Sequence, residues 1–452
     1  MTASHPAPAR SRHGVTANDK ADPIGFAVSA LNRLAQLPVL DRFRLRRPTE
    51  RAVFEATRTG FRTVGAVNRR FARAGSRRGT PARVPSAPRT DLFDLTPAED
   101  EQMLVDVVTE LADEVLRPAA AEADDASATP DKVLAAVREI GLPLLGVPES
   151  LGGISTERSA TAGALVAEAL ARGDMGLAVS SLAPGAVATA LSLWGTEEQQ
   201  ATYLPAFTGD DVPAAALALT EPRPLFDPLT PATTATRDGD GYVLNGVKSM
   251  VPRGADAELF VVGAMLDGEP RMFVVESGTP GVGIEADPAM GLRAAALTRV
   301  VLDGVRVGEI GLLGTASDTA ECVRLSRVAW SALAVGTAQA VLDYVIPYVN
   351  ERQAFGEPVS HRQGVAFMVA DIGIELQGMR LVTYRAAARA AQGKDFTREA
   401  ALARKLCAER GMRIGNDGVQ LLGGHGFVKE HPVERWYRDL RAVGVMEGTV
   451  LV

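Results

Sequence analysis

Cysteine and histidine are scarce in this sequence. The 452 residues contain two cysteines, Cys322 and Cys407, too few for a disulfide framework or a cysteine-built metal site. The histidines do not show the spacing of metal ligands; they are His5, His13, His361, His425 and His431. We therefore expect no metal, and a reducing compartment such as the cytoplasm.

Three other features are missing. No uninterrupted apolar run reaches the roughly 18 residues that a membrane-spanning helix needs. The N-terminus lacks the basic, apolar and small-residue order of a secretory signal. No GxGxxG follows a strand-like segment, which disfavours a Rossmann dinucleotide site. What is present, 46% hydrophobic and 23% charged residues, is typical of a globular protein of two or three domains.

Charge is distributed unevenly along the chain. Residues 1–90 hold 18 Lys and Arg against 5 Asp and Glu, a net +13, whereas the remainder carries a net −20. Within this basic arm, an apolar stripe predicts an amphipathic helix over residues 51–73; the stripe is Phe54, Phe61, Val64 and Phe71, flanked by Arg58, Arg62, Arg69 and Arg73. Such a helix fits docking on the body or on a partner, or peripheral contact with a membrane. It fits nucleic acid less well, because it lacks aromatics interleaved for base stacking.

Three regions with different sequence patterns follow the arm. Helical periodicity predicts an N-terminal helical domain over 91–212, with segments near 131–140, 159–172, 184–194 and 197–206. Short β-branched segments separated by Gly, Asp and Pro predict a middle domain of antiparallel strands over 213–316. Helical periodicity returns over 317–452. Segregated helices, strands and helices predict an α+β fold rather than an alternating parallel sheet.

Four stretches carry a resemblance to one family. They are 218–222 (ALTEP), 242–248 (YVLNGVK), 351–356 (ERQAFG) with Gln363 and 370–371, and 420–427 (QLLGGHGF) continuing through 432–439 (PVERWYRD) to 447–449 (EGT). In this order and at these separations they resemble the acyl-CoA dehydrogenases, over about residues 92–452. The resemblance implies a helical domain, a middle antiparallel β domain and a C-terminal helical bundle.

The chemistry of that family implies roles for the closing residues. An α-proton of a thioester is barely acidic, so its removal needs an aimed base. The β-hydrogen leaves as hydride and needs an electron sink that no side chain provides, hence FAD. The resemblance makes Glu447 the base in the α,β-dehydrogenation of a fatty acyl-CoA. It places Gly448 and Phe226 at the substrate and Thr449 beside the flavin.

The resemblance also implies the remaining cofactor contacts and partners. The FAD-binding residues would be Leu219, Thr220, Met250, Pro252, Arg352, Phe355, Gln420, Gly423, Gly424 and Thr449. Arg352 is expected to reach the pyrophosphate of a neighbouring subunit, for which a guanidinium is suited. Phe355 would pack near the adenine end. We therefore expect a homodimer or homotetramer that passes electrons to an electron-transferring flavoprotein.

Two flavin-contacting stretches depart from the family pattern. Residues 223–227 (RPLFD) stand where the family has GAGSD, so Phe226 replaces a hydroxyl. Residues 250–252 (MVP) stand where it has WIT, so a Thr donor is lost, although Met250 can still pack on a ring face. These departures leave an alternative function open, a catalytically impaired relative that acts as a binding or assembly subunit.

Overall fold

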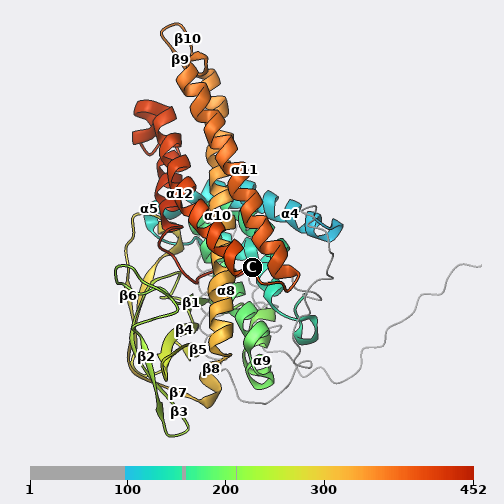
Figure 1. The fold of residues 1–452 in the computed structure, drawn as a ribbon, viewed down its shortest axis with the longest axis vertical. Helices are drawn as coiled ribbons and strands as arrows, with labels where there is room; N and C mark the ends of the chain where they lie inside the picture. The colour runs from blue at the N-terminus through green and yellow to red at the C-terminus, as the bar shows by residue number, and fades with distance from the viewer. Residues whose placement is uncertain (1–96, 155–158, 210) are drawn as a thin grey trace, which may run out of the picture. The chain divides into compact units, whose positions relative to one another are not determined.

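The computed structural model describes residues 97–154, 159–209 and 211–452. Within them, a helical region, a sheet and a second helical region follow one another along the chain (Figure 1), which confirms the predicted α+β class. The predicted arm, residues 1–90, lies outside the described residues. Its amphipathic helix, the cytoplasmic location and the membrane contact therefore stay predictions.

The first helical region contains α4 (Glu99–Leu111), a π turn η1 (Ala112–Leu116), α5 (Arg117–Ala126), α6 (Asp131–Glu139), η2 (Leu142–Gly146), η3 (Glu149–Leu151), α7 (Ala160–Gly173), α8 (Met175–Trp194), α9 (Glu197–Tyr203) and η4 (Leu204–Thr208). The segment predicted at 184–194 is only the second half of α8. Asp174 caps this helix by accepting a hydrogen bond from the Leu177 N–H at 3.0 Å. The helix then runs through Pro184, so the proline does not mark its start.

The middle region is a sheet of β1 (Ala215–Ala218), β2 (Thr234–Asp238), β3 (Gly241–Val251), β4 (Leu259–Leu266), β5 (Glu269–Glu276), β6 (Val282–Ala286), β7 (Thr298–Gly308) and β8 (Leu312–Leu313). Its order is β6-β7-β3-β2-β4-β5-β8, with β1 on β4. Most pairings are antiparallel as predicted, but β1 and part of β2 run parallel to β4. A sequence pattern does not reveal strand direction, because side chains alternate with a two-residue period in parallel and antiparallel strands alike.

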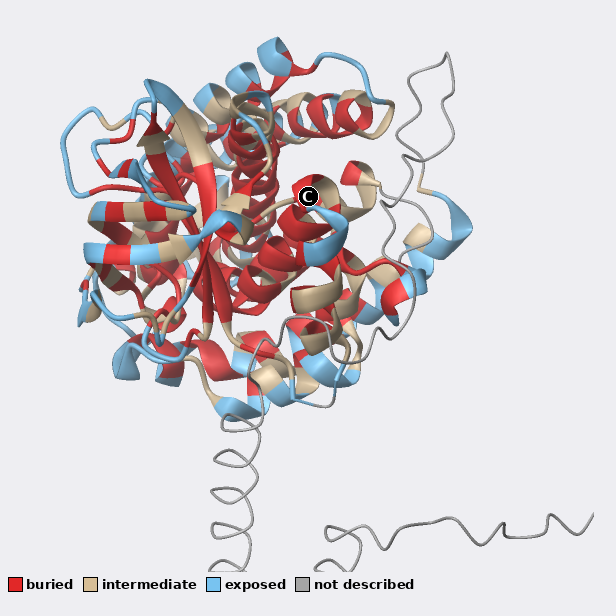
Figure 2. Cartoon of the chain, turned by 90° about the horizontal axis from the view of Figure 1, so that it is seen from below, coloured by how far each residue is buried: buried red, intermediate tan, exposed pale blue. Residues whose placement is uncertain are grey.

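The sheet contributes to two cores. Along β4, Leu259 and Val261 join the core of the helices, whereas Phe260 and Val262 join a separate core on the other face. Side chains of a strand alternate between faces, so a strand buried on both faces reads as a continuous apolar run. Figure 2 shows the buried residues concentrated where the helices pack on one another and on the sheet.

The second helical region contains α10 (Ala316–Glu351), a hairpin of β9 (Gln353–Ala354) and β10 (Glu357–Pro358), η7 (Val359–His361), α11 (Gln363–Ala391), α12 (Thr397–Leu422), η8 (Gly423–Phe427) and α13 (Val433–Ala442). The hairpin lies at the far end of α10 and α11 (Figure 1). Of the helices in the described residues, two, α8 and α10, have the length and hydropathy of membrane spans. However, 78% and 61% of their apolar windows are buried inside the structure, as in core helices.

Candidate functional site

Glu447 lies in the segment after α13 and is 7% exposed. Its Oε1 accepts from Arg327 Nε at 3.2 Å and from Arg327 Nη2 at 2.9 Å, and its Oε2 accepts from Arg327 Nε at 3.1 Å. Arg404 Nη2 stands 3.5 Å from Oε1. We call Glu447, Arg327 and Arg404 the base cluster. It joins α10, α12 and the closing segment, and it carries two cations on one carboxylate.

The backbone around Glu447 is fixed from two sides. The Thr220 hydroxyl accepts from the Glu447 N–H at 3.2 Å and donates to the Glu447 carbonyl at 2.9 Å. On the other side, the Gly448 carbonyl accepts from Ser326 Oγ at 2.6 Å and from Trp330 Nε1 at 2.9 Å. These bonds hold the residue predicted as the base against the residue after β1 that was predicted to contact the flavin.

Gly448 and Thr449 follow in unusual backbone conformations. Gly448 has φ +69°, and a Cβ there would lie 2.8 Å from Leu219 Cγ. Thr449 is buried with φ +76°, a region that costs a non-glycine residue roughly 1–3 kcal/mol. Leu219, Thr220, Glu447, Gly448 and Thr449, all predicted site residues, are thus brought together. Strain of this kind concentrates at functional sites.

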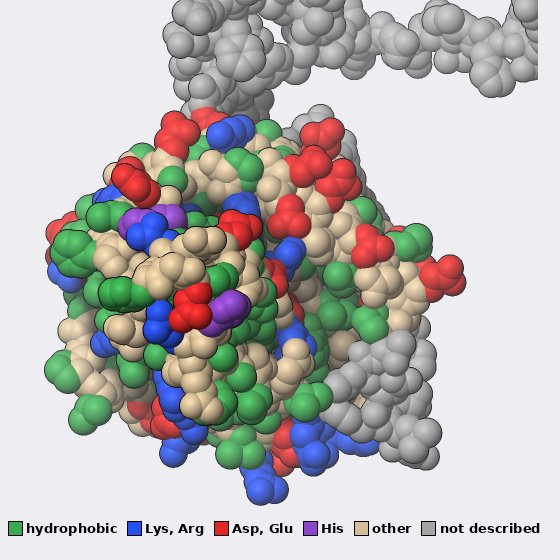
Figure 3. Space-filling view, turned by 90° about the horizontal axis from the view of Figure 1, so that it is seen from above, with side chains coloured by type: hydrophobic (Ala, Val, Ile, Leu, Met, Phe, Trp, Pro, Cys, Tyr) green, Lys and Arg blue, Asp and Glu red, His purple; other side chains and the backbone are tan. Residues whose placement is uncertain are grey.

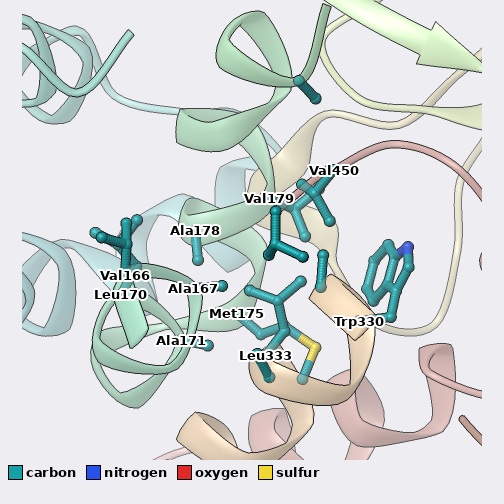
Figure 4. Packing of buried hydrophobic residues seen from close by; sticks show 14 of the residues in the cluster. Val166, Ala167, Leu170, Ala171, Met175, Ala178, Val179, Trp330, Leu333 and Val450 are labelled. Atoms are coloured by element: carbon teal, nitrogen blue, oxygen red, sulfur yellow. The ribbon is translucent and has the colours of Figure 1, made fainter. Parts of the chain in front are cut away.

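The helices beside the closing segment are tightly packed. Figure 4 shows Val450 next to Val179 of α8, with Trp330 and Leu333 of α10 nearby. Trp330 is fully buried, and so is Val450. Val450 of the closing segment thus belongs to the same buried core as α8 and α10.

A buried ion pair couples two of the motifs. Lys248 Nζ lies 2.9 Å from Glu221 Oε1, with both side chains almost fully buried. Burial lowers the pKa of Lys248 to about 8, although Glu221 opposes this shift. Burial alone would raise the pKa of Glu221, but the Lys248 ammonium and the hydrogen bonds from Thr233 together hold that pKa below its usual value. The Ser249 N–H also donates to the Thr220 carbonyl at 2.9 Å, so a hydrogen bond and an ion pair connect β3 with the 219–221 segment.

The departing stretches take up strained positions. Met250 is half-buried with φ +56°, and its N–H donates to Asp287 Oδ2 at 3.0 Å. Pro252 is buried. Phe226 is half-buried, with the Arg223 guanidinium 5.6 Å from its ring centre. The Met250 side chain thus packs against the helical core, while Phe226 lies in the loop after Glu221.

A second group of predicted residues lines an open pocket of about 500 Å³ at the far end of α10. We call it the glycine pocket; its lining includes Tyr348, Arg352, Met368, Gln420, Gly423, Gly424 and His425. A Cβ at Gly423 or Gly424 would meet no atom within 4 Å. Phe355, on the hairpin, is 98% exposed and is not among the lining residues. In the view onto this end, hydrophobic side chains are interspersed with Lys, Arg and His (Figure 3).

Within one chain, the two groups lie far apart. Arg327, in the base cluster, and Arg352, the C-cap of α10 in the glycine pocket, are 25 positions apart, which is about 37 Å along the helix at 1.5 Å per residue. Arg352 is exposed at the end of that helix. The predicted cofactor residues therefore form two half-sites rather than one.

Sequence reasoning missed two residues of the base cluster, Arg327 and Arg404. One signal was available for Arg327, which is the only charged residue between Arg324 and Asp343 in the largely apolar middle of α10. A charged residue inside an apolar helix needs a buried partner. Nothing comparable marks Arg404, because α12 carries many charges and only the fold turns this one inward.

Comparison with known proteins matches consecutive parts of the chain. The N-terminal domain of acyl-CoA dehydrogenases matches residues 98–210, their middle domain 216–305 and their C-terminal domain 317–451. The short-chain specific acyl-CoA dehydrogenase, mitochondrial, of Bos taurus is 33% identical over 366 residues, which are 78% of this chain and 87% of that protein.

Solved structures agree with these matches. The chain resembles butyryl-CoA dehydrogenase from Megasphaera elsdenii with a TM-score of 0.72 and 27% identity, covering 79% of this chain and 96% of that one. It also resembles a glutaryl-CoA dehydrogenase from Mycobacterium smegmatis in complex with FADH2. There the TM-score is 0.70 and the identity 25%, covering 78% and 92% of the two chains.

Proposed function

Because the chain belongs to the acyl-CoA dehydrogenase family of FAD-dependent oxidoreductases, which act on the CH–CH bond of an acyl-CoA, we propose that it dehydrogenates a fatty acyl-CoA with Glu447 as the base. One observation carries the proposal. Glu447 is a buried carboxylate whose backbone is fixed on both sides, next to the residues expected to hold the flavin.

The residues present fit FAD. Gly423 and Gly424 leave open space where a side chain would stand, so a ligand can approach their backbone closely. Arg352 offers an unburied guanidinium beside them for a phosphate. Around the base cluster, Leu219, Thr220, Met250, Pro252 and Thr449 would face the ring. When bound there, FAD supplies the hydride acceptor that side chains lack.

Proton abstraction is the task of this chain's own residues. Oε1 of Glu447 receives two of the three contacts from Arg327 and the one from Arg404, whereas Oε2 receives only the third contact from Arg327, at 3.1 Å. Oε2 is therefore the less engaged oxygen, and we assign it as the acceptor of the α-proton. The 27% exposure of the Arg327 side chain leaves it room to withdraw from Oε2 when substrate enters. The backbone bonds from Thr220 and Ser326 keep the carboxylate aimed meanwhile.

The separation of the two half-sites supports an oligomer. A single chain cannot bring the glycine pocket and the base cluster to the same cofactor, because they lie about 37 Å apart along α10. We propose a homodimer or homotetramer in which Arg352, with Phe355 on the adjacent hairpin, serves the FAD of a neighbouring subunit. Reoxidation then falls to an electron-transferring flavoprotein.

Glu447→Gln tests the proposed base. The amide keeps the packing and the Thr220 bonds but cannot accept a proton, so reduction of bound flavin by saturated acyl-CoAs should fall by about 10²- to 10⁴-fold. FAD should stay bound. The measurement is bleaching of the flavin band with a panel of chain lengths. The matched control is Glu409→Gln, an exposed α12 residue paired with Lys405, which should bleach at the wild-type rate.

Two outcomes would redirect the assignment. Equal bleaching by Glu447→Gln and wild type would remove Glu447 as the base. A yellow wild-type protein that no acyl-CoA bleaches would favour the alternative, a binding or assembly subunit. The observation behind that alternative is the replacement of the two flavin-contacting stretches by 223–227 (RPLFD) and 250–252 (MVP).

A further inference from the structure

Arg404 is the more buried of the two cations on Glu447. Its side chain is 12% exposed, against 27% for Arg327. It comes from α12, whereas Arg327 comes from α10. One nitrogen, Nη2, donates to the Met446 carbonyl at 2.5 Å and also stands 3.5 Å from Glu447 Oε1. Arg404 therefore holds both the carboxylate and the peptide that precedes it.

The surroundings of Arg404 indicate a fixed cation. Burial lowers the pKa of its guanidinium, Glu447 opposes this shift, and the charge of Arg327 adds to it. Its Nη1 is buried without a hydrogen-bond partner in the described part of the chain. A buried charge with few bonds is costly unless a counter-charge stays beside it. Arg404 thus needs Glu447 as its partner in every state of the site.

Arg327 differs because water reaches it. A partly exposed guanidinium exchanges a carboxylate for solvent at modest cost. If both cations left Glu447 together, the carboxylate would lose its orientation, and a misplacement of about 1 Å can cost 10²-fold in rate. One cation must remain when the other moves.

We propose that Arg404 is a positioning residue for the base: it retains Oε1 of Glu447 and the Met446 carbonyl while Arg327 releases Oε2 for the α-proton. This inference rests on the proposed function of Glu447. It divides the two arginines by role. Arg327 is the exchangeable partner, and Arg404 is the permanent one that sets where the carboxylate points.

The experiment compares Arg404→Met, which removes the charge, with Arg404→Lys, whose ammonium can still donate to both oxygens. Flavin reduction at saturating acyl-CoA should fall about 10²-fold in Arg404→Met through loss of orientation. The dissociation constant for acyl-CoA should not change. Arg404→Lys should recover most of the rate. The matched control is Arg410→Met, which removes another α12 arginine, one that pairs with Glu375, and should leave the rate unchanged.

A rate equal to wild type in Arg404→Met, or no recovery in Arg404→Lys, would overturn the assignment. If Arg404→Met does not fold, Arg404→Gln takes its place, since its amide can donate to Met446 but carries no charge; it should be as slow as expected for Arg404→Met.

A measurement without substrate tests the interaction of Arg404 with Glu447 independently of the proposed function. Thermal unfolding is measured for Arg404→Met, Glu447→Gln and the double variant. Arg404→Met should lower the midpoint in the wild-type background more than in the Glu447→Gln background. Additive shifts would show that the two residues do not interact, whatever the enzyme does with acyl-CoA.

Discussion

The base cluster and the glycine pocket are built in opposite ways. At the base cluster, every charge has a counter-charge from the same chain, and the carboxylate is 7% exposed. At the glycine pocket, Arg352 is exposed and the two glycines face open space. The first region is completed by folding of one chain. The second is complete only when a ligand, and on our proposal a neighbouring subunit, supplies the missing contacts.

The difference teaches where binding energy and stability reside. Removing one partner of a buried ion pair strands the other, which is strongly destabilising. Truncating an exposed arginine costs the ligand-free protein little stability. The contribution of such an arginine is therefore seen only when its ligand is bound. We therefore expect substitutions in the base cluster to change stability and chemistry, and substitutions in the glycine pocket to change cofactor retention and assembly.

Arg352→Ala should give the largest effect. Loss of a charge-assisted contact across a subunit interface costs on the order of 2–5 kcal/mol, so FAD affinity should fall and the oligomer should loosen together. Fluorescence titration with FAD and sedimentation velocity measure the two. The control is Arg413→Ala, a half-exposed α12 arginine paired with Asp371 and Asp417, which should change neither. Unchanged FAD affinity in Arg352→Ala would break the comparison.

The same substitution, glycine to alanine, can be made in each of the two regions, and the two variants should differ. In Gly448→Ala, the new Cβ would lie 2.8 Å from Leu219 at φ +69°, so overpacking should cost about 1–3 kcal/mol of unfolding free energy. In Gly424→Ala, the Cβ would meet nothing within 4 Å, so stability should be unchanged while FAD binds more weakly. Denaturant unfolding of the FAD-free proteins measures the free energy of unfolding of each variant. Equal stability losses would show that the glycine pocket is not open in the free protein.

Lys248→Met should strand the buried Glu221 carboxylate and, in addition, remove a smaller contribution to stability that depends on pH. The pKa of Lys248 is lowered to about 8 in the folded protein, whereas an unfolded lysine titrates near 10.5. Between these values the unfolded chain binds more protons, so this group makes stability rise with pH from about 8 upward. The rise should reach about 2 kcal/mol by roughly pH 9.5, and Lys248→Met should lack it. Parallel stability curves for the two proteins across that range would contradict the assigned burial.

Much of the fold followed from local patterns. Helical periodicity located α6, α7 and α9 within a few residues, and the β-branched segments located the sheet. Two details differ from the local patterns. The helical segment predicted near 184–194 covers only the second half of α8, because Asp174 caps the helix ten residues before Pro184. The middle domain is antiparallel as predicted in most strand pairs, but β1 and part of β2 run parallel to β4.

The sequence alone predicted most of the candidate site residues, since Glu447, Thr220, Arg352 and Gly424 all lie in contiguous motifs. It did not predict Arg327 or Arg404. Only the tertiary structure decided how the site residues are grouped. It separated the predicted cofactor residues into one group beside Arg327 and another beside Arg352, because the helix between these arginines keeps them about 37 Å apart. It also turned Arg404 of α12 inward onto a carboxylate 43 positions further along the chain. Charge pairing of this kind depends on which helix faces meet, and that is settled by packing of the whole core rather than by any local stretch.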